Sequence, residues 1–356
     1  MNRLSLTAAA LLGIASILPA AAQSSITLYG VVDVSVESVK GTDTLTRISS
    51  GNLNTSRLGF KGIEDLGSGL TAKFVLESAI SADTGANGGG SARFWDRAAW
   101  VGLGSGFGEL RLGRIDSALG LTADKIGTQA YDDLRLAGTR AANNYRRIDN
   151  TVTYILPASL FSGLTGQLQY STGAVGYAST GAVSATTAGT ESTAKAGRAW
   201  SANLGYTVGP FAAEAAYLMS RDENSVQAGN QKAKAGIVLA SWDFGVVKAT
   251  GYYSGESQLG GANRLAVWGL KLGIPVTPAF VLTPGYSRST GTTLAGGDDD
   301  KVNIFSLKGV YSVSKRTAVY VWFDHISNGD AATKGIVTTA AGENGRGLAL
   351  GVRHAF

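Results

Sequence analysis

The chain has 356 residues, of which 16% are charged, and its formal net charge at pH 7 is +5. So small a surplus gives no indication of a nucleic-acid partner, and the lack of cysteine excludes disulfides and thiolate metal sites as a means of stabilisation. The 49 glycines, about twice the usual frequency, together with the low charge, favour many short strands.

The first residues have the features of a secretory signal peptide. Arg3 precedes an apolar run from Leu4 to Leu18, and Ala20, Ala21 and Ala22 form a small-residue cleavage site. We therefore predict a signal peptide over 1–22 and one β-barrel domain over 23–356. No other stretch approaches 18 uninterrupted apolar residues, so membrane-spanning helices are not expected.

From residue 25 onwards the sequence alternates between apolar and polar residues. In SITLYGVVDVSVE, residues 25–37, the apolar Ile26 and Leu28 share one parity and the polar Asp33 and Glu37 share the other. The same pattern predicts sixteen strands, near 25–37, 55–64, 70–78, 92–104, 107–114, 149–156, 163–171, 198–207, 211–219, 232–243, 245–254, 264–273, 279–288, 301–312, 316–325 and 345–356.

The connections between these strands alternate between short turns, such as 105–106, and long polar loops, such as 172–197 and 326–344. An even number of strands with short turns at one end and long loops at the other is typical of an outer-membrane barrel. A soluble sandwich or propeller is the alternative, but no repeat near 40 residues is visible and the last strand ends on the aromatic Phe356.

The stretches SSITLYGVVDVSV, SRLGFKGIEDLGSGLTAKFVLE, RAAWVGLGSGFGELRLGR, SKRTAVY and GVRHAF together resemble the general porins of Gram-negative outer membranes. The likeness is closest to the type found in β-proteobacteria such as Neisseria, Bordetella and Comamonas. It implies an all-β fold, a 16-stranded antiparallel transmembrane barrel, whose third loop folds inward. It further implies a homotrimer with both chain ends in the periplasm and Phe356 as the membrane insertion signal.

The expected constriction loop is 115–147, which carries acidic and basic residues between two predicted strands. In related porins, basic side chains on one wall of the lumen face the inserted loop, and the resemblance places Arg57, Arg97 and Arg147 on that wall, opposite Asp132 and Asp133. The full set of expected constriction residues is Arg57, Lys61, Arg97, Asp116, Asp124, Asp132, Asp133, Arg135, Arg140, Arg146 and Arg147.

Basic groups outnumber acidic ones in this set, which predicts passive diffusion of small hydrophilic solutes and ions with a modest anion preference. The expected partners are a homotrimer, outer-membrane lipid and lipopolysaccharide, and neither a cofactor nor a metal is implied. One alternative is a solute-specific channel, in which Arg93, Trp95, Tyr131 and Tyr145 contact the solute. Another is a lipid-modifying surface barrel, but His325 and His354 lie near no recognisable serine elbow.

Overall fold

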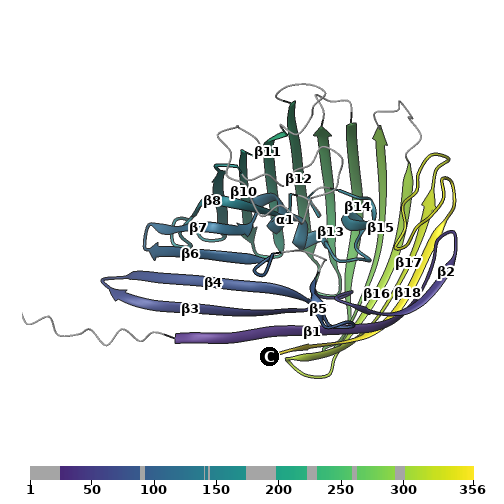
Figure 1. Ribbon diagram of the computed structural model, residues 1–356, viewed down its shortest axis with the longest axis horizontal. Coiled ribbons are helices and arrows are strands. Elements are labelled where there is room, and N and C mark those ends of the chain that lie inside the picture. Colours follow the sequence, from purple (N-terminus) through teal and green to yellow (C-terminus); the bar gives the residue numbers. More distant parts are fainter. Residues whose placement is uncertain are drawn as a thin grey trace, which may run out of the picture.

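The computed structural model describes residues 25–88, 93–139, 141–142, 145–173, 198–222, 231–258, 263–292 and 301–356 (Figure 1). The predicted signal peptide lies outside these ranges. Eighteen strands and two helices occur within them: β1 (Ser25–Lys40), β2 (Thr44–Ser50), β3 (Arg57–Gly67), β4 (Leu70–Ser81), β5 (Ala86–Asn87), β6 (Ala98–Ser105), β7 (Gly108–Asp116), α1 (Ala118–Ile126), α2 (Asp133–Leu136), β8 (Arg147–Ile155), β9 (Leu164–Ser171), β10 (Ala199–Val208), β11 (Phe211–Asp222), β12 (Gln231–Asp243), β13 (Lys248–Gln258), β14 (Asn263–Thr277), β15 (Phe280–Thr292), β16 (Val302–Ser312), β17 (Thr317–Asn328) and β18 (Gly345–Ala355).

The strands form one closed antiparallel barrel. Each wall strand pairs with the next along the chain, and β1 pairs with β18 from Val31 opposite Ala355 to Lys40 opposite Arg346. Of the eighteen described strands, β5 pairs with β4 alone, and β2 and β3 share one edge of β1, so the wall has sixteen strands. The predicted number of strands and the predicted fold class are therefore confirmed.

The seam between the first and last strands is closed by the chain end. The backbone N–H of Phe356 donates to the Gly30 carbonyl, and that of Gly30 donates to the Phe356 carbonyl, both at 3.1 Å. A Cβ atom at Gly30 would lie 2.4 Å from the Phe356 ring, so a glycine is required for the ring to lie over β1.

The second wall strand is interrupted, which the alternation of residues did not predict. β2 pairs with the second half of β1, from Val34 to Lys40, and β3 pairs with the first half, from Ser25 to Val31. Residues 51–56 bulge between β2 and β3. The bulge is attached to β1 by the N–H of Asp33, which donates to Ser56 Oγ at 2.9 Å, and by the N–H of Gly51, which donates to the Asp33 carbonyl at 2.9 Å. The bulge places Thr55 within hydrogen-bond distance of Gln129.

Short turns lie at one end of the barrel and long connections at the other. Between β3 and β4, Ser68 (φ 52°) and Gly69 (φ 77°) both have positive φ, as a two-residue hairpin turn with the sheet's twist requires. The connections 117–146 and 329–344 lie at the opposite end. This arrangement agrees with the predicted alternation of turns and loops.

Alternating side chains face outward and inward. On β18, the outward Leu348, Leu350 and Val352 are 51%, 66% and 50% exposed, whereas on β1 the inward Asp33 and Glu37 are buried. Outward aromatic rings also contact one another, as in the pair Trp268 and Tyr286 with centroids 5.7 Å apart. An apolar outer wall with aromatic residues is typical of a barrel in a lipid bilayer.

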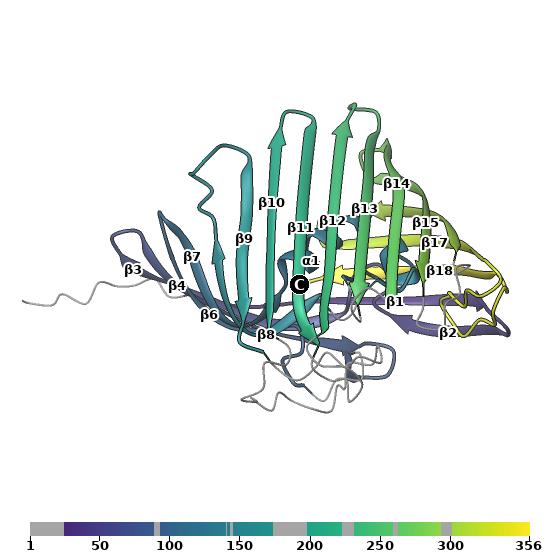
Figure 2. The ribbon, with the colours of Figure 1, turned by 90° about the horizontal axis from the view of Figure 1, so that it is seen from above.

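The barrel also contains an apolar core, which the sequence analysis did not predict. Inward side chains of β11 and β12, such as Leu218 and Ile237, are buried against Leu119, Leu134 and other residues of the third loop. Figures 1 and 2 show α1 inside the ring of strands. One side of the lumen is thus filled by packed protein. No helix in the described ranges is long and apolar enough to cross a membrane.

Candidate constriction site

The third loop, defined here as residues 117–146, enters the lumen through helix α1. Ser117 caps this helix, because its Oγ accepts the N–H of Gly120 at 2.8 Å and donates to the Tyr145 carbonyl at 2.5 Å. A Cβ atom at Gly120 would lie 2.4 Å from the Arg146 carbonyl oxygen, so the glycine allows the two ends of the loop to lie side by side. The sequence analysis did not identify this helix.

Helix α1 is fixed to the inner wall by polar contacts. The N–H of Ala118 donates to Gln169 Oε1 of β9 at 2.6 Å. On β11, Glu214 accepts a hydrogen bond from Thr122 Oγ1 at 2.5 Å and pairs with Lys125. Contacts to two separate wall strands hold the helix inside the barrel at a fixed height.

The acidic pair of the loop does not lie where the sequence analysis expected it. Asp133 is fully buried and Asp132 is 4% exposed. Lys271 Nζ lies 3.5 Å from Asp132 Oδ1 and 3.4 Å from Asp133 Oδ2, and the Tyr252 hydroxyl donates to Asp133 Oδ2 at 2.5 Å. The pair therefore anchors the loop to β13 and β14 and does not face Arg57, Arg97 and Arg147 across the lumen. The expectation for Asp132 and Asp133 was wrong because their cation, Lys271, lies on a distant wall strand, and the residues of the loop do not indicate its position.

The loop crosses the lumen to the first wall strands. The Tyr131 hydroxyl donates to Glu37 Oε2 of β1 at 2.8 Å, and Thr55 Oγ1 donates to Gln129 Oε1 at 2.9 Å. Burial, together with the Glu37 carboxylate, raises the pKa of Tyr131 well above its ordinary value, so this hydroxyl remains a donor. Tyr131 and Tyr145 are both fully buried, which removes them from the group of residues that contact a solute.

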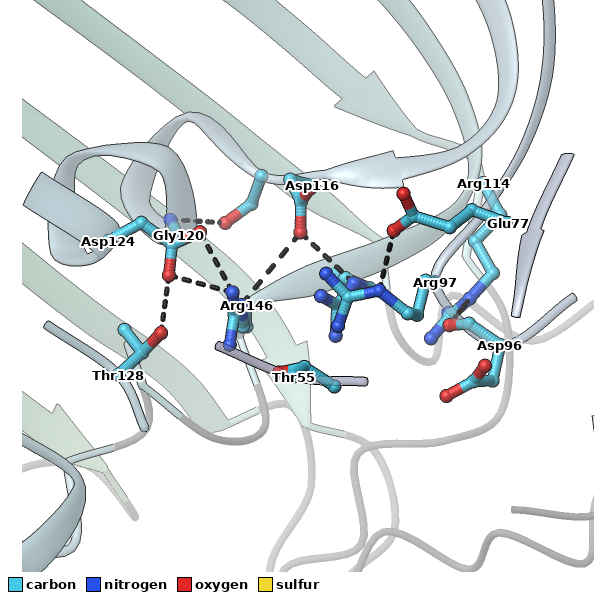
Figure 3. Close-up of polar contacts among 12 residues, drawn as sticks. Thr55, Glu77, Asp96, Arg97, Arg114, Asp116, Gly120, Asp124, Thr128 and Arg146 are labelled. Carbon is cyan, nitrogen blue, oxygen red and sulfur yellow. Dashed lines mark hydrogen bonds and ion pairs between the residues drawn. The ribbon is translucent and has the colours of Figure 1, made fainter. Parts of the chain in front are cut away.

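Two of the predicted wall arginines share one carboxylate. Arg97 Nε lies 2.5 Å from Glu77 Oε1, and Arg57 Nε lies 3.5 Å from Glu77 Oε2. The Tyr29 hydroxyl also donates to Glu77 at 2.9 Å. Figure 3 shows Arg97 directed toward Glu77. One negative charge is thus held between two positive ones.

Arg146 and Arg147 contact two aspartates, Asp116 at the end of β7 and Asp124 in helix α1. Arg147 Nε lies 3.1 Å from Asp116 Oδ1, and Arg146 reaches both Asp116 at 4.0 Å and Asp124 at 2.8 Å (Figure 3). Asp124 also accepts a hydrogen bond from Thr128. Asp116 and Asp124, and not Asp132 and Asp133, are therefore the aspartates that meet the basic wall.

The sequence analysis missed a third group on the same wall. Arg93 Nη1 and Arg114 Nη1 bind Asp149, at 2.6 and 2.5 Å. Arg114 also donates from Nε to the Asp96 carbonyl at 2.7 Å. The sequence did contain a signal for this ion pair. Arg114 lies three residues before the loop and Asp149 three residues after it, and the two strands that carry them are neighbours in the barrel.

Three predicted residues differ from this group. Arg135 is exposed, and desolvation by the surrounding protein, together with repulsion from Arg146, lowers its pKa, although an arginine stays charged at pH 7. Lys61 lies further toward the short-turn end, with Nζ 5.4 Å from the centroid of the Tyr29 ring. Arg140 lies outside the described residues.

These contacts define the arginine wall, a group of arginines on β3, β7 and β8, in the segment before β6 and at the end of the third loop. Repulsion from Arg97, Arg114 and Arg146 acts on Arg147, so the cations are close enough to influence one another. Six arginines face four carboxylates within the described residues, which leaves an excess of two positive charges: Arg57, Arg93, Arg97, Arg114, Arg146 and Arg147 against Glu77, Asp116, Asp124 and Asp149.

A closed sixteen-stranded barrel with an apolar outer wall and a loop inserted across a charged lumen defines a membrane channel. The chain belongs to the Gram-negative porin family, whose model matches residues 6–331. It is therefore an outer-membrane porin, a channel for passive diffusion and not an enzyme.

Individual proteins support the same assignment. Outer membrane porin protein 32 of Delftia acidovorans is 31% identical, over 95% of this chain and 95% of its own length. An outer membrane porin protein of Bordetella pertussis is 28% identical, and the match covers 100% of both chains. Among solved structures, the anion-selective porin from Comamonas acidovorans superposes with a TM-score of 0.75 at 27% identity, covering 94% of this chain and 100% of that one.

Proposed function

We propose that this porin is a general diffusion channel with a weak preference for anions, and that the arginine wall is the source of that preference. The carrying observation is the excess of two positive charges among the ion-paired groups of the wall. The exposed Arg135 adds a further positive charge on the loop.

The acidic residues of the loop do not cancel this excess. Asp132 and Asp133 are buried against Lys271 and are withdrawn from the lumen. A lumen wall of one predominant sign concentrates counterions within a Debye length, about 8 Å at physiological salt. Because several opposite charges remain on the wall, the expected preference is weak.

The relatives give independent support to this proposal. The solved porin from Comamonas acidovorans is described as anion-selective. At 27% identity this likeness shows a shared fold. The argument for an anion preference in this chain is the net positive charge of its own arginine wall. The residues 1–22, which carry the features of a signal peptide, agree with export to the outer membrane.

We also propose that the protein assembles as a homotrimer. The sequence stretch 79–91, which begins within β4, is rich in glycine and resembles the segment that reaches into a neighbouring subunit in trimeric porins. A Vibrio cholerae outer membrane protein with the same fold, at a TM-score of 0.62, has been solved in a trimer form. Conductance that closes in three equal steps would support the trimer, whereas single-step closure would contradict it.

The experiment for selectivity is the reversal potential of the purified protein in a planar bilayer under a salt gradient. The reversal potential of the wild type should lie toward the chloride equilibrium potential. The reversal potential of the triple variant R57Q/R97Q/R147Q should lie closer to the equilibrium potential of the cation. The matched control is K248Q/K315Q/R316Q, which removes three exposed cations at the short-turn end. Equal potentials for wild type and R57Q/R97Q/R147Q would contradict the role of the arginine wall.

The same recordings distinguish a general pore from a solute-specific channel. In a general pore, conductance rises in proportion to salt concentration. Saturation at low salt would indicate a binding site in the lumen, because a bound ion delays the next one.

A further inference from the structure

The chain between β17 and β18 forms a second inserted segment, called here the strap and defined as residues 329–344 (Figure 1). Ala332 is fully buried and Thr339 is 5% exposed, although both lie in a connection between strands. Ile336 packs against both apolar clusters inside the barrel, and Val337 packs against one of them. The strap therefore turns inward over the lumen.

One asparagine sets the shape of the strap. Asn328, the last residue of β17, donates from Nδ2 to the Lys334 carbonyl at 2.8 Å and to the Glu343 carbonyl at 2.6 Å, and its Oδ1 accepts the N–H of Lys334 at 3.1 Å. The N–H of Gly342 also donates to the Ala332 carbonyl at 3.1 Å. A side-chain amide has two N–H donors, and here they bind carbonyls at both ends of the strap, so its two halves are held together.

The strap is also fastened to the first strands. The N–H of Thr42, in the turn between β1 and β2, donates to the Thr338 carbonyl at 3.1 Å, and the N–H of Ala340 donates to Thr42 Oγ1 at 3.0 Å. A Cβ atom at Gly41 would lie 2.1 Å from the Thr338 oxygen, so the strap approaches this turn as closely as a glycine allows. Because β1 pairs with β18, the strap crosses the seam of the barrel.

The strap meets the third loop over Gly347 of β18. The Ile336 Cδ1 atom and the Tyr131 Cε1 atom lie 2.2 and 2.8 Å from the position that a Cβ atom would take on this glycine, so the two side chains meet there. Tyr131 is fully buried, and Ile336 packs against the cluster that contains it. At a second place, Lys334 Nζ lies 3.2 Å from the position of a Cβ atom at Gly138 of the third loop.

The contact with Ile336 bears on the attachment of the third loop to the wall. The Tyr131 hydroxyl donates to Glu37 Oε2 at 2.8 Å, and this bond fixes the middle of the loop to β1. Such a hydrogen bond contributes most where water does not compete for the carboxylate. The aliphatic side chain of Ile336 approaches the Tyr131 ring from the strap and excludes water without offering another hydrogen-bond partner.

We propose that the strap positions the constriction: Ile336 holds Tyr131 against Glu37, and this contact keeps the third loop at one place in the lumen. Ile336 is a positioning residue in this scheme, because it acts on the passing solute only through Tyr131. The proposal rests on the channel activity of the porin, and not on its anion preference or on the trimer.

The test compares the open-channel current noise of variants in a planar bilayer, with amide hydrogen exchange of the third loop in detergent as a second measurement. Ile336→Ala removes most of the aliphatic side chain and should raise the population of displaced third loop about tenfold or more. Current noise and the exchange of residues 127–138 should both increase. Ile336→Val should give an intermediate result, and Ile336→Leu, which keeps the volume, should resemble wild type.

A double-variant cycle separates positioning from a general loss of stability. Tyr131→Phe removes the hydroxyl and should raise the current noise by itself, and the addition of Ile336→Ala should then raise it by less than in the wild-type background. The matched control is Ile26→Ala, the same substitution at a side chain that is 71% exposed on the outer wall. It should change neither the noise nor the exchange of the third loop.

Current noise and third-loop exchange equal to wild type in I336A would overturn the proposal. Fully additive effects of I336A and Y131F would show that Ile336 does not act through Tyr131, and would overturn it as well. Neither measurement depends on the sign of the ion preference, which the reversal potential reports, or on the number of closing steps. A failure of the strap is therefore distinguishable from a failure of the arginine wall or of the trimer.

Discussion

Arg97 Nε and Glu77 Oε1 lie 2.5 Å apart on the inner wall of the barrel, and the same carboxylate lies within 3.5 Å of Arg57. Glu77 therefore masks part of the positive charge of the arginine wall. The wild-type selectivity reflects a balance between these groups and not the arginines alone.

Replacement of Glu77 by glutamine should increase the anion preference. The amide keeps the size of the side chain and removes the one carboxylate that Arg57 and Arg97 share, so the permeability ratio of chloride to potassium should rise about twofold. Reversal potentials in a salt gradient measure this ratio. The matched control is Glu109→Gln, which removes a carboxylate paired with Lys73 and Arg111 nearer the short-turn end. A shift of E77Q toward cations would contradict the masking role of Glu77.

Loss of the Tyr252 hydroxyl should loosen the third loop. Its hydrogen bond to the fully buried Asp133 is 2.5 Å long, and Tyr252→Phe leaves that carboxylate without this donor. The expected cost is about 1–3 kcal/mol of folding free energy. Calorimetry should show a lower Tm, and single-channel records should show more current noise. Tyr253→Phe, on the lipid-facing side of the same strand, is the control and should change neither quantity.

Removal of the Lys271 ammonium should destabilise the protein more strongly. Lys271 lies within 3.5 Å of both Asp132 and Asp133, which are buried, and Lys271→Met leaves them without this cation. Breaking a buried pair in this way costs about 3–5 kcal/mol. The temperature at which the barrel unfolds in detergent should fall, and the double variant K271M/D132N should recover part of the loss. Equal stability of K271M and wild type would show that the anchor depends on other contacts.

A methyl group at Gly120 should displace the returning end of the loop. The added Cβ would lie 2.4 Å from the Arg146 carbonyl oxygen, so Gly120→Ala must move Arg146 away from Asp116 and Asp124. We expect a changed single-channel conductance and a shift of the reversal potential. Gly251→Ala is the control, because a Cβ there meets no atom within 4 Å. Identical conductance of G120A and wild type would contradict this close approach.

The sequence predicted the barrel well, and the constriction only in part. Alternation identified all sixteen wall strands because the two faces of each strand meet different solvents. For the second wall strand it predicted only 55–64 and missed β2, whose place in the wall depends on pairing with β1. Arg57 and Arg97 pair with Glu77 and Arg147 pairs with Asp116, and the part of these arginines in the constriction stays a prediction. The direction of Asp132 and Asp133 was not predictable, because it is fixed by Lys271 and Tyr252, more than 100 residues further along the chain.

The Tyr131 side chain connects parts of the chain that are far apart in sequence. Its hydroxyl binds Glu37 of the first strand, and its ring lies 5.7 Å from that of Trp322 in the strand before last. The middle of the chain thus spans the seam where the two ends of the sheet meet. Contacts of such long sequence separation form slowly, because the intervening chain must first be brought together. Barrel closure should accordingly be the late, rate-limiting event of folding, and it should require the third loop to be inside beforehand.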